Sequence, residues 1–429
     1  MKNLKSENGS ITSLVIVTVL FFVTILSTSY MVVNALRKSQ LKSQINAKDV
    51  YERDLKRVDE IVAELENRKN KVWPEPKEEN ETINGEVGNA YNPTIPAGYI
   101  PINTDSSKWG DGTTTPTTDA VDYGLVIKDK KDNEWVWIPV DETTLATMYT
   151  TSENGEQLAG TEVKTNLYSS TITIGKDSNT KTITRTTPGT TSTGNLREPD
   201  LVVGNDGASY DAKEKYYKTI LGFESKEKMA ETFVADYKKM IASIKKYGGF
   251  YIGRYELSET GVQKDQSTLV EKNWYNLYKK CKSLNASEKV VTRMIWGCQW
   301  DVTCNFIANK GEQKSITDSH SWANYQNTSV KADDGTTEIK ARGTEAVLNT
   351  GVTTFTMANN IYDLAGNCDE WTQEAYDAIG RVARGGGYES LYKTVYDWYR
   401  DTPISENSGI GTRNSSHFNN KVESINLSV

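Results

Sequence analysis

Histidine and cysteine are scarce in this chain of 429 residues, which has two histidines and four cysteines. Because a metal centre held by three histidines needs one more imidazole than the chain has, such a centre is excluded. The cysteines are too few and too scattered for a disulfide framework, and none stands in a Cys-x-x-Cys pair, which argues against a structural zinc site. They are Cys281, Cys298, Cys304 and Cys368.

Basic residues are also in the minority, with 50 Lys and Arg against 57 Asp and Glu and a net charge of −7. This balance argues against a nucleic-acid-binding protein, whose contact face is basic. Aromatic residues are plentiful, with 23 Tyr and 10 Trp against 8 Phe. An excess of amphipathic rings suits a surface that binds a ligand. The length allows roughly two or three structural units.

One long stretch has no charged residue, between Glu7 and Arg37, and residues 11–33 are almost wholly apolar. A helix over these residues would be about 34 Å long, enough for a bilayer core of about 30 Å. We therefore predict a transmembrane helix over 10–36, with 1–9 as a leader or cytoplasmic tail. A cleaved secretory signal is the alternative, but its apolar region is usually only about 7–15 residues long.

The start of the chain, ENGSITSLVIVTVLFFVTILSTSYMVV, resembles the N-terminus of a type IV prepilin or pseudopilin. The resemblance implies cleavage after Gly9, which would leave Ser10 as the new N-terminus. The chain departs from that family at Leu14, where Glu is usual, so an ordinary signal anchor with a cytoplasmic N-terminus stays open. Basic residues flank the apolar stretch on both sides and leave its orientation open. Both interpretations place the remainder outside the cytoplasm and predict a single-pass protein of the cell membrane.

Residues 37–72 contain no Gly or Pro and predict a helical stalk, with apolar residues at alternating spacings of four and three. This pattern lasts about two heptads, so either self-association or packing on the chain's own domain would satisfy it. Residues 73–95 are rich in Pro, Glu, Asn and Gly and predict an acidic linker. Residues 150–215 are polar and predict a surface loop or small hairpin inserted in the following domain.

The globular part, 96–429, is expected to be an α+β domain with long loops, because short apolar runs alternate with a few helical patterns. Many Gly, Asn, Asp and Thr residues follow Lys310, and a bound cation is one way to hold such loops. Strands are expected at 123–128, 134–140 and 249–257, and helices at 226–247, 274–281 and 293–308.

The run NNIYDLAGNCDEWTQEAY, followed by RVARGGGY, spans residues 359–388. It resembles the hallmark segment of the sulfatase-modifying factor family, which includes the formylglycine-generating enzymes. Further segments in the same order, among them YGGFYIGRYEL and RMIWGCQWDVTCNFIA, extend the resemblance over most of 96–429. The resemblance implies a C-type lectin-like fold.

Residues of this run could bind a metal ion. Asp363 and Glu370 offer carboxylates, and the turn at Gly366 and Asn367 can aim carbonyl oxygens inward, a mixture that suits calcium. The resemblance implies a calcium site formed by Asp363, Gly366, Cys368 and Glu370, with Gly366 and Cys368 contributing backbone oxygens. The alternative is a metal-free loop in which Glu370 accepts backbone hydrogen bonds.

Two further positions belong to the same prediction. Asn324 is a candidate for a second family site upstream. Asp369 stands where the family commonly has an aromatic residue, and its charge either strengthens a cation site or faces solvent.

The family's oxygen-using branches depend on ligands that this chain lacks. The resemblance implies copper held by two cysteines downstream of the RGG segment, or iron held by three histidines. Residues 385–429 contain no cysteine, and the chain has only two histidines. Cys298 and Cys304 would fall on different faces of one helix and are expected to be buried apolar residues. We therefore predict a catalytically silent domain, with a metal-dependent oxidoreductase that uses an unrecognised site as the alternative.

The segment 385–418 concentrates aromatic side chains beside charged ones, as binding loops do. The resemblance implies that this stretch lines the ligand face. We predict a membrane-anchored, extracytoplasmic recognition module for a protein or glycan, associated with a pilus or secretion apparatus, and a structural minor pilin is a further possibility. The candidate ligand-binding residues are Tyr392, Tyr396, Trp398, Tyr399 and Arg400.

Overall fold

A computed structural model describes residues 18–38, 56–57, 76, 78–110, 114–148, 157–159, 162–164, 170–185, 216–284, 289–375 and 380–418. The chain divides into two units, Met1–Trp73 and Pro74–Val429. The predicted cleavage position at Gly9 and Ser10 lies outside the described residues. So does most of the predicted stalk; its described residues are Arg37 and Lys38, which end the helix Thr18–Lys38, and Lys56 and Arg57, which are helical.

In the first unit, residues Thr18–Lys38 form a helix of 21 residues that is long and apolar enough to cross a membrane. Its hydroxyl groups bond to the helix's own backbone, and Thr24 Oγ1, for example, donates to the carbonyl of Leu20 at 2.7 Å. Ser27 and Thr28 donate in the same way to carbonyls one turn earlier. A hydroxyl satisfied within its own helix costs little in lipid. The predicted apolar helix is therefore confirmed in its central and C-terminal part.

The second unit is built around a six-stranded antiparallel sheet with the order β11-β20-β10-β5-β4-β3. The central strand β5 has consecutive buried residues, including Trp135 and Trp137, because both of its faces are covered. These strands are β3 (Tyr99–Ile102), β4 (Val126–Asp129), β5 (Glu134–Pro139), β10 (Gly249–Gly253), β11 (Val290–Met294) and β20 (Asn414–Phe418).

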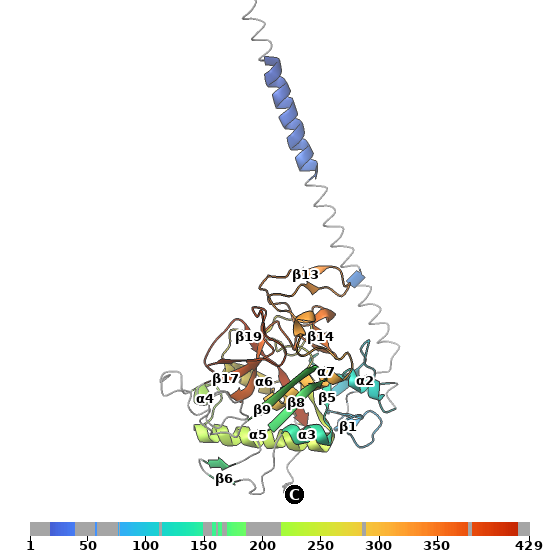
Figure 1. The fold of residues 1–429 in the computed structure, drawn as a ribbon, viewed down its shortest axis with the longest axis vertical. Helices are drawn as coiled ribbons and strands as arrows, with labels where there is room; N and C mark the ends of the chain where they lie inside the picture. The colour runs from blue at the N-terminus through green and yellow to red at the C-terminus, as the bar shows by residue number, and fades with distance from the viewer. Residues whose placement is uncertain are drawn as a thin grey trace, which may run out of the picture. The chain divides into compact units, whose positions relative to one another are not determined.

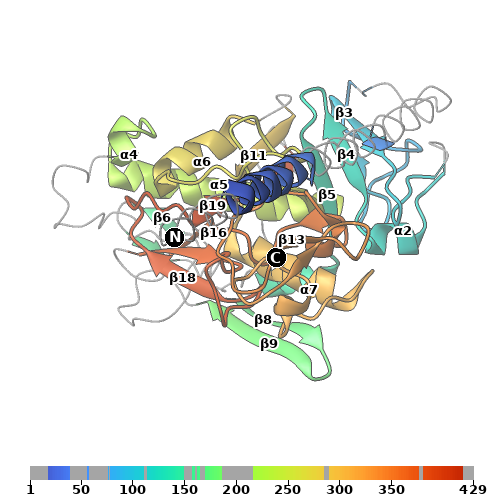
Figure 2. The same cartoon turned by 90° about the horizontal axis from the view of Figure 1, so that it is seen from above.

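A second sheet carries the segments of greatest interest. It has the order β18-β17-β16-β19, in which β16 pairs antiparallel with β17 and parallel with β19. The strand β18 forms one edge of this sheet (Figure 2). Its strands are β16 (Asp369–Ala375), β17 (Arg381–Arg384), β18 (Trp398–Asp401) and β19 (Ile410–Thr412).

Short two-stranded sheets complete the strands of this unit. They pair β1 (Glu81–Thr82) with β2 (Thr94–Ile95), β6 (Gln157–Ala159) with β7 (Glu162–Lys164), β8 (Ser170–Lys176) with β9 (Asn179–Arg185), β12 (Val330–Lys331) with β13 (Glu338–Lys340), and β14 (Met357–Ala358) with β15 (Ile361–Tyr362).

The helix α5 (Lys226–Tyr247), labelled in Figure 1, packs on β10 and β20. Ser225 caps its first turn by accepting from the amide of Lys228, and Gly248 ends it with a left-handed φ of 76°. The residues that face the core recur every three or four positions, which is why the sequence predicted this helix correctly. The other helices are α2 (Thr118–Asp122), α3 (Glu142–Met148), α4 (Tyr216–Thr219), α6 (Trp274–Lys282), α7 (Gly297–Asn309), and the 3₁₀ turns η3 (Ser319–Ser321) and η4 (Thr354–Thr356).

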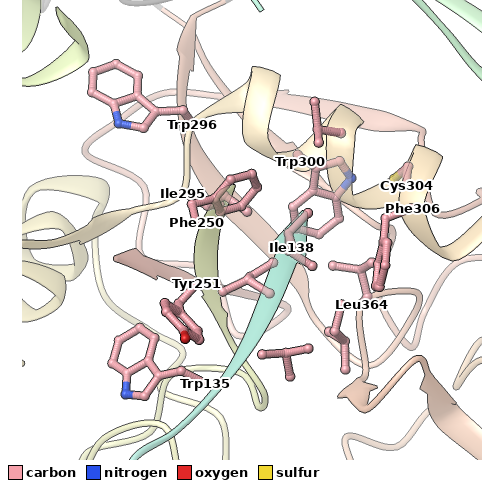
Figure 3. Packing of buried hydrophobic residues seen from close by; sticks show 14 of the residues in the cluster. Trp135, Ile138, Phe250, Tyr251, Ile295, Trp296, Trp300, Cys304, Phe306 and Leu364 are labelled. Atoms are coloured by element: carbon pink, nitrogen blue, oxygen red, sulfur yellow. The ribbon is translucent and has the colours of Figure 1, made fainter. Parts of the chain in front are cut away.

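The hydrophobic core lies between these helices and the large sheet. Figure 3 shows Trp300, Cys304 and Phe306 of α7 beside Ile138 of β5 and Leu364. Trp296 packs edge-to-face on Tyr237 at 5.1 Å between ring centroids. The indole N–H of Trp300 donates to the carbonyl of Val395 at 3.0 Å and so joins the core to the loop before β18.

Two expectations from the sequence need correction. The predicted helix over 293–308 is a strand followed by a helix, because β11 runs to Met294 and α7 begins at Gly297. The predicted linker over 73–95 includes β1 and β2, and Thr82 and Ile83 are buried. The polar insertion contains a small hairpin, β8–β9, which is one of the two forms predicted for it; its Ile172, Ile174 and Ile183 are buried, and it packs on α7 (Figure 2).

Candidate functional site

A surface cavity of about 290 Å³ lies where three segments of the smaller sheet meet. Asp369 opens β16, and its amide donates to the carbonyl of Gly409 at 2.9 Å. The central position of β16 between β17 and β19 therefore brings the turn after β17 beside the segment that leads into β19. The cavity is lined by Asp369, Gly387, Tyr388, Glu389, Ser390, Lys393, Tyr399, Asn407, Gly409 and Ile410.

An ion pair and an aromatic ring form one side of this cavity. The ammonium of Lys393 lies 3.0 Å and 3.3 Å from the two carboxylate oxygens of Asp369. The same ammonium lies 4.7 Å from the ring centroid of Tyr399. Burial raises the pKa of Asp369, and the charge of Lys393 opposes that rise. A carboxylate and an aromatic face therefore hold one cation here.

Tyr388, Glu389 and Asn407 form the other side. Tyr388 hydrogen-bonds to the Glu389 carboxylate, which together with partial burial raises the pKa of its phenol to about 12. The backbone amide of Tyr388 donates to the carbonyl of Asn367 at 2.8 Å, which fixes this turn to the loop before β16. The Oδ1 atom of Asn407 accepts from the amide of Gly409 at 2.7 Å. These two hydrogen bonds to backbone groups thus hold Tyr388 and Asn407 in place.

The five aromatic and basic residues predicted to bind ligand separate into three groups. Tyr399 lines the cavity. Tyr392, Trp398 and Arg400 are exposed, with Tyr392 88% accessible and Trp398 38%. Tyr396 is half-buried against the core, under the ammonium of Lys181 at 5.2 Å from its ring centroid.

The predicted calcium ligands lie in the interior of the domain. Asp363, Gly366, Cys368 and Glu370 are all buried. Oδ2 of Asp363 accepts from Thr350 Oγ1 and from the amide of Gly351, both at 2.9 Å. The carboxylate of Asp363, the first of the predicted metal ligands, therefore already accepts hydrogen bonds from the protein.

The Glu370 carboxylate is also engaged by a protein group. Both of its oxygens accept from the guanidinium of Arg413, at 2.6–3.1 Å. Arg413 also donates to the carbonyls of Gly253 and Tyr362 and so ties the two sheets together. A cation of the protein itself thus already compensates the Glu370 carboxylate, and the calcium site stays a prediction.

Glu256 and Asp363 lie near Glu370. The three buried carboxyl groups form a cluster around the guanidinium of Arg413. Burial, together with the charges of Asp363 and Glu370, raises the pKa of Glu256 well above its ordinary range. Burial also raises the pKa of Glu370, to about 7, against the opposing charge of Arg413. Glu256 accepts from the amide of Cys368 at 3.1 Å and from Asn367 Nδ2 at 2.6 Å. This cluster holds the AGNCDE turn in place.

Within the described residues, no group of three or more His, Cys, Asp or Glu side chains is arranged to hold a metal ion. Asn324, the candidate for a second site, donates to Asn367 Oδ1 at 2.9 Å, and its backbone bridges Gly366. Cys298 lies near the Tyr237 hydroxyl, whereas Cys304 lies near the Val395 carbonyl, and all four cysteines are buried.

Most of the residues that line the cavity lie in the predicted segment 385–418, but of the five predicted ligand-binding residues only Tyr399 is among them. Glu389, Lys393, Asn407 and Gly409 carry no recognisable motif. Asp369 was noticed only as a departure from the family pattern. Its partner Lys393 is 24 positions away, and only the pairing of β16 with β17 and β19 brings these segments together.

Comparisons with known proteins add little. No protein-family model matches the chain, and no curated protein matches it. Two similar solved structures are variable protein 1 of Treponema denticola and CarF. The first is 15% identical, with a TM-score of 0.26, over 40% of this chain and 85% of its own. The second is 14% identical, with a TM-score of 0.30, over 40% of this chain and 87% of its own.

Proposed function

We propose that this chain is a membrane-anchored recognition protein whose second unit binds an extracytoplasmic ligand in the cavity between Asp369, Tyr399 and Gly409. The helix Thr18–Lys38 would anchor it as a single-pass protein of the cell membrane. The observation that carries the proposal is the cavity itself, in which charged, amide and aromatic groups from three segments face one space. Concave sites with a few convergent polar groups are the usual form of a binding site.

The surroundings of the cavity support a ligand larger than the cavity. Tyr392 is exposed and directly precedes the cavity-lining Lys393 in the chain, and Trp398 is exposed on the opposite face of β18 from Tyr399; both are large amphipathic rings. Such residues provide contact area at low cost in conformational entropy, and they are enriched in interfaces and binding loops. The cavity would therefore take one side chain or sugar ring of a protein or glycan, while the exposed ring of Tyr392 contacts its neighbours.

The resemblance to the sulfatase-modifying factor family, with its C-type lectin-like fold, forms part of this proposal. Catalytic silence is proposed as well, because the segment after RGG lacks the family's copper-binding cysteines. Burial raises the pKa of the thiols of Cys281, Cys304 and Cys368 and keeps them protonated, which does not suit a metal ligand. Metal analysis of the purified protein tests the enzyme alternative, since a tightly held redox metal would support an oxidoreductase.

A variant that fills the cavity tests the proposal. Gly409 has space for a side chain, because a Cβ atom there would lie no closer than 3.4 Å to any neighbour. Gly409→Leu should fill the cavity, while Gly409→Ala adds one methyl group and serves as the matched control. Full-length protein in lipid nanodiscs would be applied to arrays of bacterial glycans and surface peptides. Ligands bound by the wild type and Gly409→Ala but lost with Gly409→Leu support the proposal, and unchanged binding by Gly409→Leu contradicts it.

Two further measurements test the anchor. Protease treatment of intact cells should remove the second unit if it lies outside the cytoplasm. Mass spectrometry of the native N-terminus distinguishes a retained Met1, as in a signal anchor, from a chain that begins at Ser10, as in a pilin-like subunit.

A further inference from the structure

The part of the cavity above Gly409 is surrounded by hydrogen-bond acceptors and an aromatic ring. A carbon atom placed at the Cβ position of Gly409 would lie 3.4 Å from Asn407 Oδ1, 3.8 Å from Tyr388 Cε1 and 4.0 Å from Glu389 Oε1. A ligand group at this point therefore meets two acceptor oxygens and the edge of a ring. Such surroundings favour a group that donates hydrogen bonds and carries positive charge.

The other side of the cavity already holds such a group. The ammonium of Lys393 lies against the Asp369 carboxylate and the Tyr399 ring, at the distances given above. Glu389 and Tyr388 offer the same two kinds of group, a carboxylate beside an aromatic ring. Within the described residues, however, no Lys or Arg side chain forms an ion pair with Glu389. Lys393 thus shows how this cavity accommodates an ammonium, and Glu389 offers a second position for one.

The charges of the lining point to the same kind of ligand. Asp369, Glu389 and Lys393 are its charged members, and together they carry one net negative charge. Because Lys393 compensates Asp369, the uncompensated charge is that of Glu389. Glu389 is exposed, so its carboxylate is accessible to a cation that enters the cavity.

We propose that the cavity binds the side-chain ammonium of a lysine residue on a protein partner, with Glu389 as its counter-ion and Tyr388 beside it. This inference rests on the proposed function and adds the chemistry of the ligand. A lysine fits because its flexible four-carbon stem can enter the cavity while its backbone stays outside. The exposed ring of Tyr392, next to Lys393 in the chain, would then contact a residue beside that lysine.

A titration with two peptides tests the inference. Full-length protein in nanodiscs would be titrated with Ac-Gly-Lys-Gly-NH₂ and with the same peptide acetylated on its lysine, with binding followed by ligand-observed NMR. Acetylation removes the charge but keeps the length of the side chain. The unmodified peptide should bind at least roughly tenfold more tightly, a factor that corresponds to about 1.4 kcal/mol. Equal binding of the two peptides, or no binding of the unmodified one at millimolar concentration, overturns the inference.

Two carboxylate variants identify the counter-ion. Glu389→Gln should reduce the affinity for the unmodified peptide by roughly tenfold. Glu142→Gln, a matched change at an exposed position of α3 outside the cavity, should leave the affinity unchanged. Equal affinities for the two variants would contradict the role of Glu389.

Two further results separate this inference from the proposed function. If a neutral glycan binds, and Gly409→Leu abolishes that binding while Glu389→Gln does not, the ammonium inference fails and the proposed function stands. If glucosamine binds more tightly than the lysine peptide, the protein partner is contradicted. If no ligand of the wild type responds to Gly409→Leu, the proposed function fails.

Discussion

The guanidinium of Arg413 donates to both carboxylate oxygens of Glu370 in the interior of the domain, at 2.6–3.1 Å, and both side chains are fully buried. Because Arg413 also bonds to the carbonyls of Gly253 and Tyr362, it connects strands of both sheets. A residue predicted to bind a metal is therefore part of an internal ion pair. This pair fixes the turn from which Asp369 reaches the cavity.

Loss of Arg413 should destabilise the domain strongly. Arg413→Met leaves the Glu370 carboxylate buried without a counter-ion, and breaking a buried pair in this way costs about 3–5 kcal/mol. Urea denaturation measures the change in the free energy of unfolding. The control is Arg342→Met, since Arg342 is exposed and should contribute less than about 1 kcal/mol. Equal stabilities of the two variants would show that the ion pair contributes nothing.

Glu256 should make the protein less stable as the pH rises. Burial and the charges of Asp363 and Glu370 raise its pKa in the folded state, so between its ordinary pKa and the raised one the folded chain binds a proton that the unfolded chain has lost. The stability due to this proton is complete at low pH and is lost as the pH rises through that range. The stability of wild type relative to Glu256→Gln should therefore fall as the pH rises above the ordinary glutamate pKa of 4.5. A constant or rising difference in urea denaturation would contradict this account.

His417 should make the protein less stable as the pH falls. Its imidazole is buried on β20, and burial, with the charge of Arg293, lowers its pKa from 6.5 to about 3. The unfolded chain takes up a proton below about pH 6.5 that the folded chain does not, so stability is lost as the pH falls. At about 1.4 kcal/mol per pH unit, the loss by pH 5 is about 2 kcal/mol. His417→Gln should remove this loss from the denaturation profile, and an unchanged acid slope in the variant would count against it.

Calcium should have little effect on stability. The carboxylates of Asp363 and Glu370 already accept from protein donors, among them the guanidinium of Arg413. A site filled at a hundred times its dissociation constant would stabilise the fold by about 2.7 kcal/mol, which raises the melting temperature by several degrees. We expect the melting temperatures in calcium and in EDTA to agree within about one degree. A rise of several degrees in calcium would restore the metal site predicted from the sequence.

The periodic spacing of apolar residues predicted the helices and strands whose buried face is formed within one segment. The spacing of Met229, Phe233 and Tyr237 gives α5 its buried face, and the apolar run that contains Trp135 and Trp137 forms the buried strand β5. These patterns depend on burial over a few consecutive turns or residues, so a single segment contains them.

Predictions failed where the structure depends on contacts between distant segments. The polar composition around Thr82 did not predict a strand. The strand depends on pairing with Thr94 and on packing against the core, and neither can be inferred from the segment alone. Asp369 meets Lys393 and Gly409 only because β16 lies between β17 and β19. Of the cavity lining, the sequence therefore indicated the segment 385–418 and Tyr399 within it, but not the pairing of Asp369 with Lys393, and it did not indicate the guanidinium beside Glu370.

Covalent mapping of the ligand position tests the central claim most directly. A lysine peptide with a photoreactive diazirine beside its lysine would be irradiated with the full-length protein in nanodiscs, and mass spectrometry would locate the attached residues. We expect labels within 387–410 and at Asp369, and we expect acetylated-lysine peptide to compete for them poorly and Gly409→Leu to lose them. Labels concentrated elsewhere on the chain, or labelling unchanged in Gly409→Leu, would contradict the assignment of this cavity as the binding site.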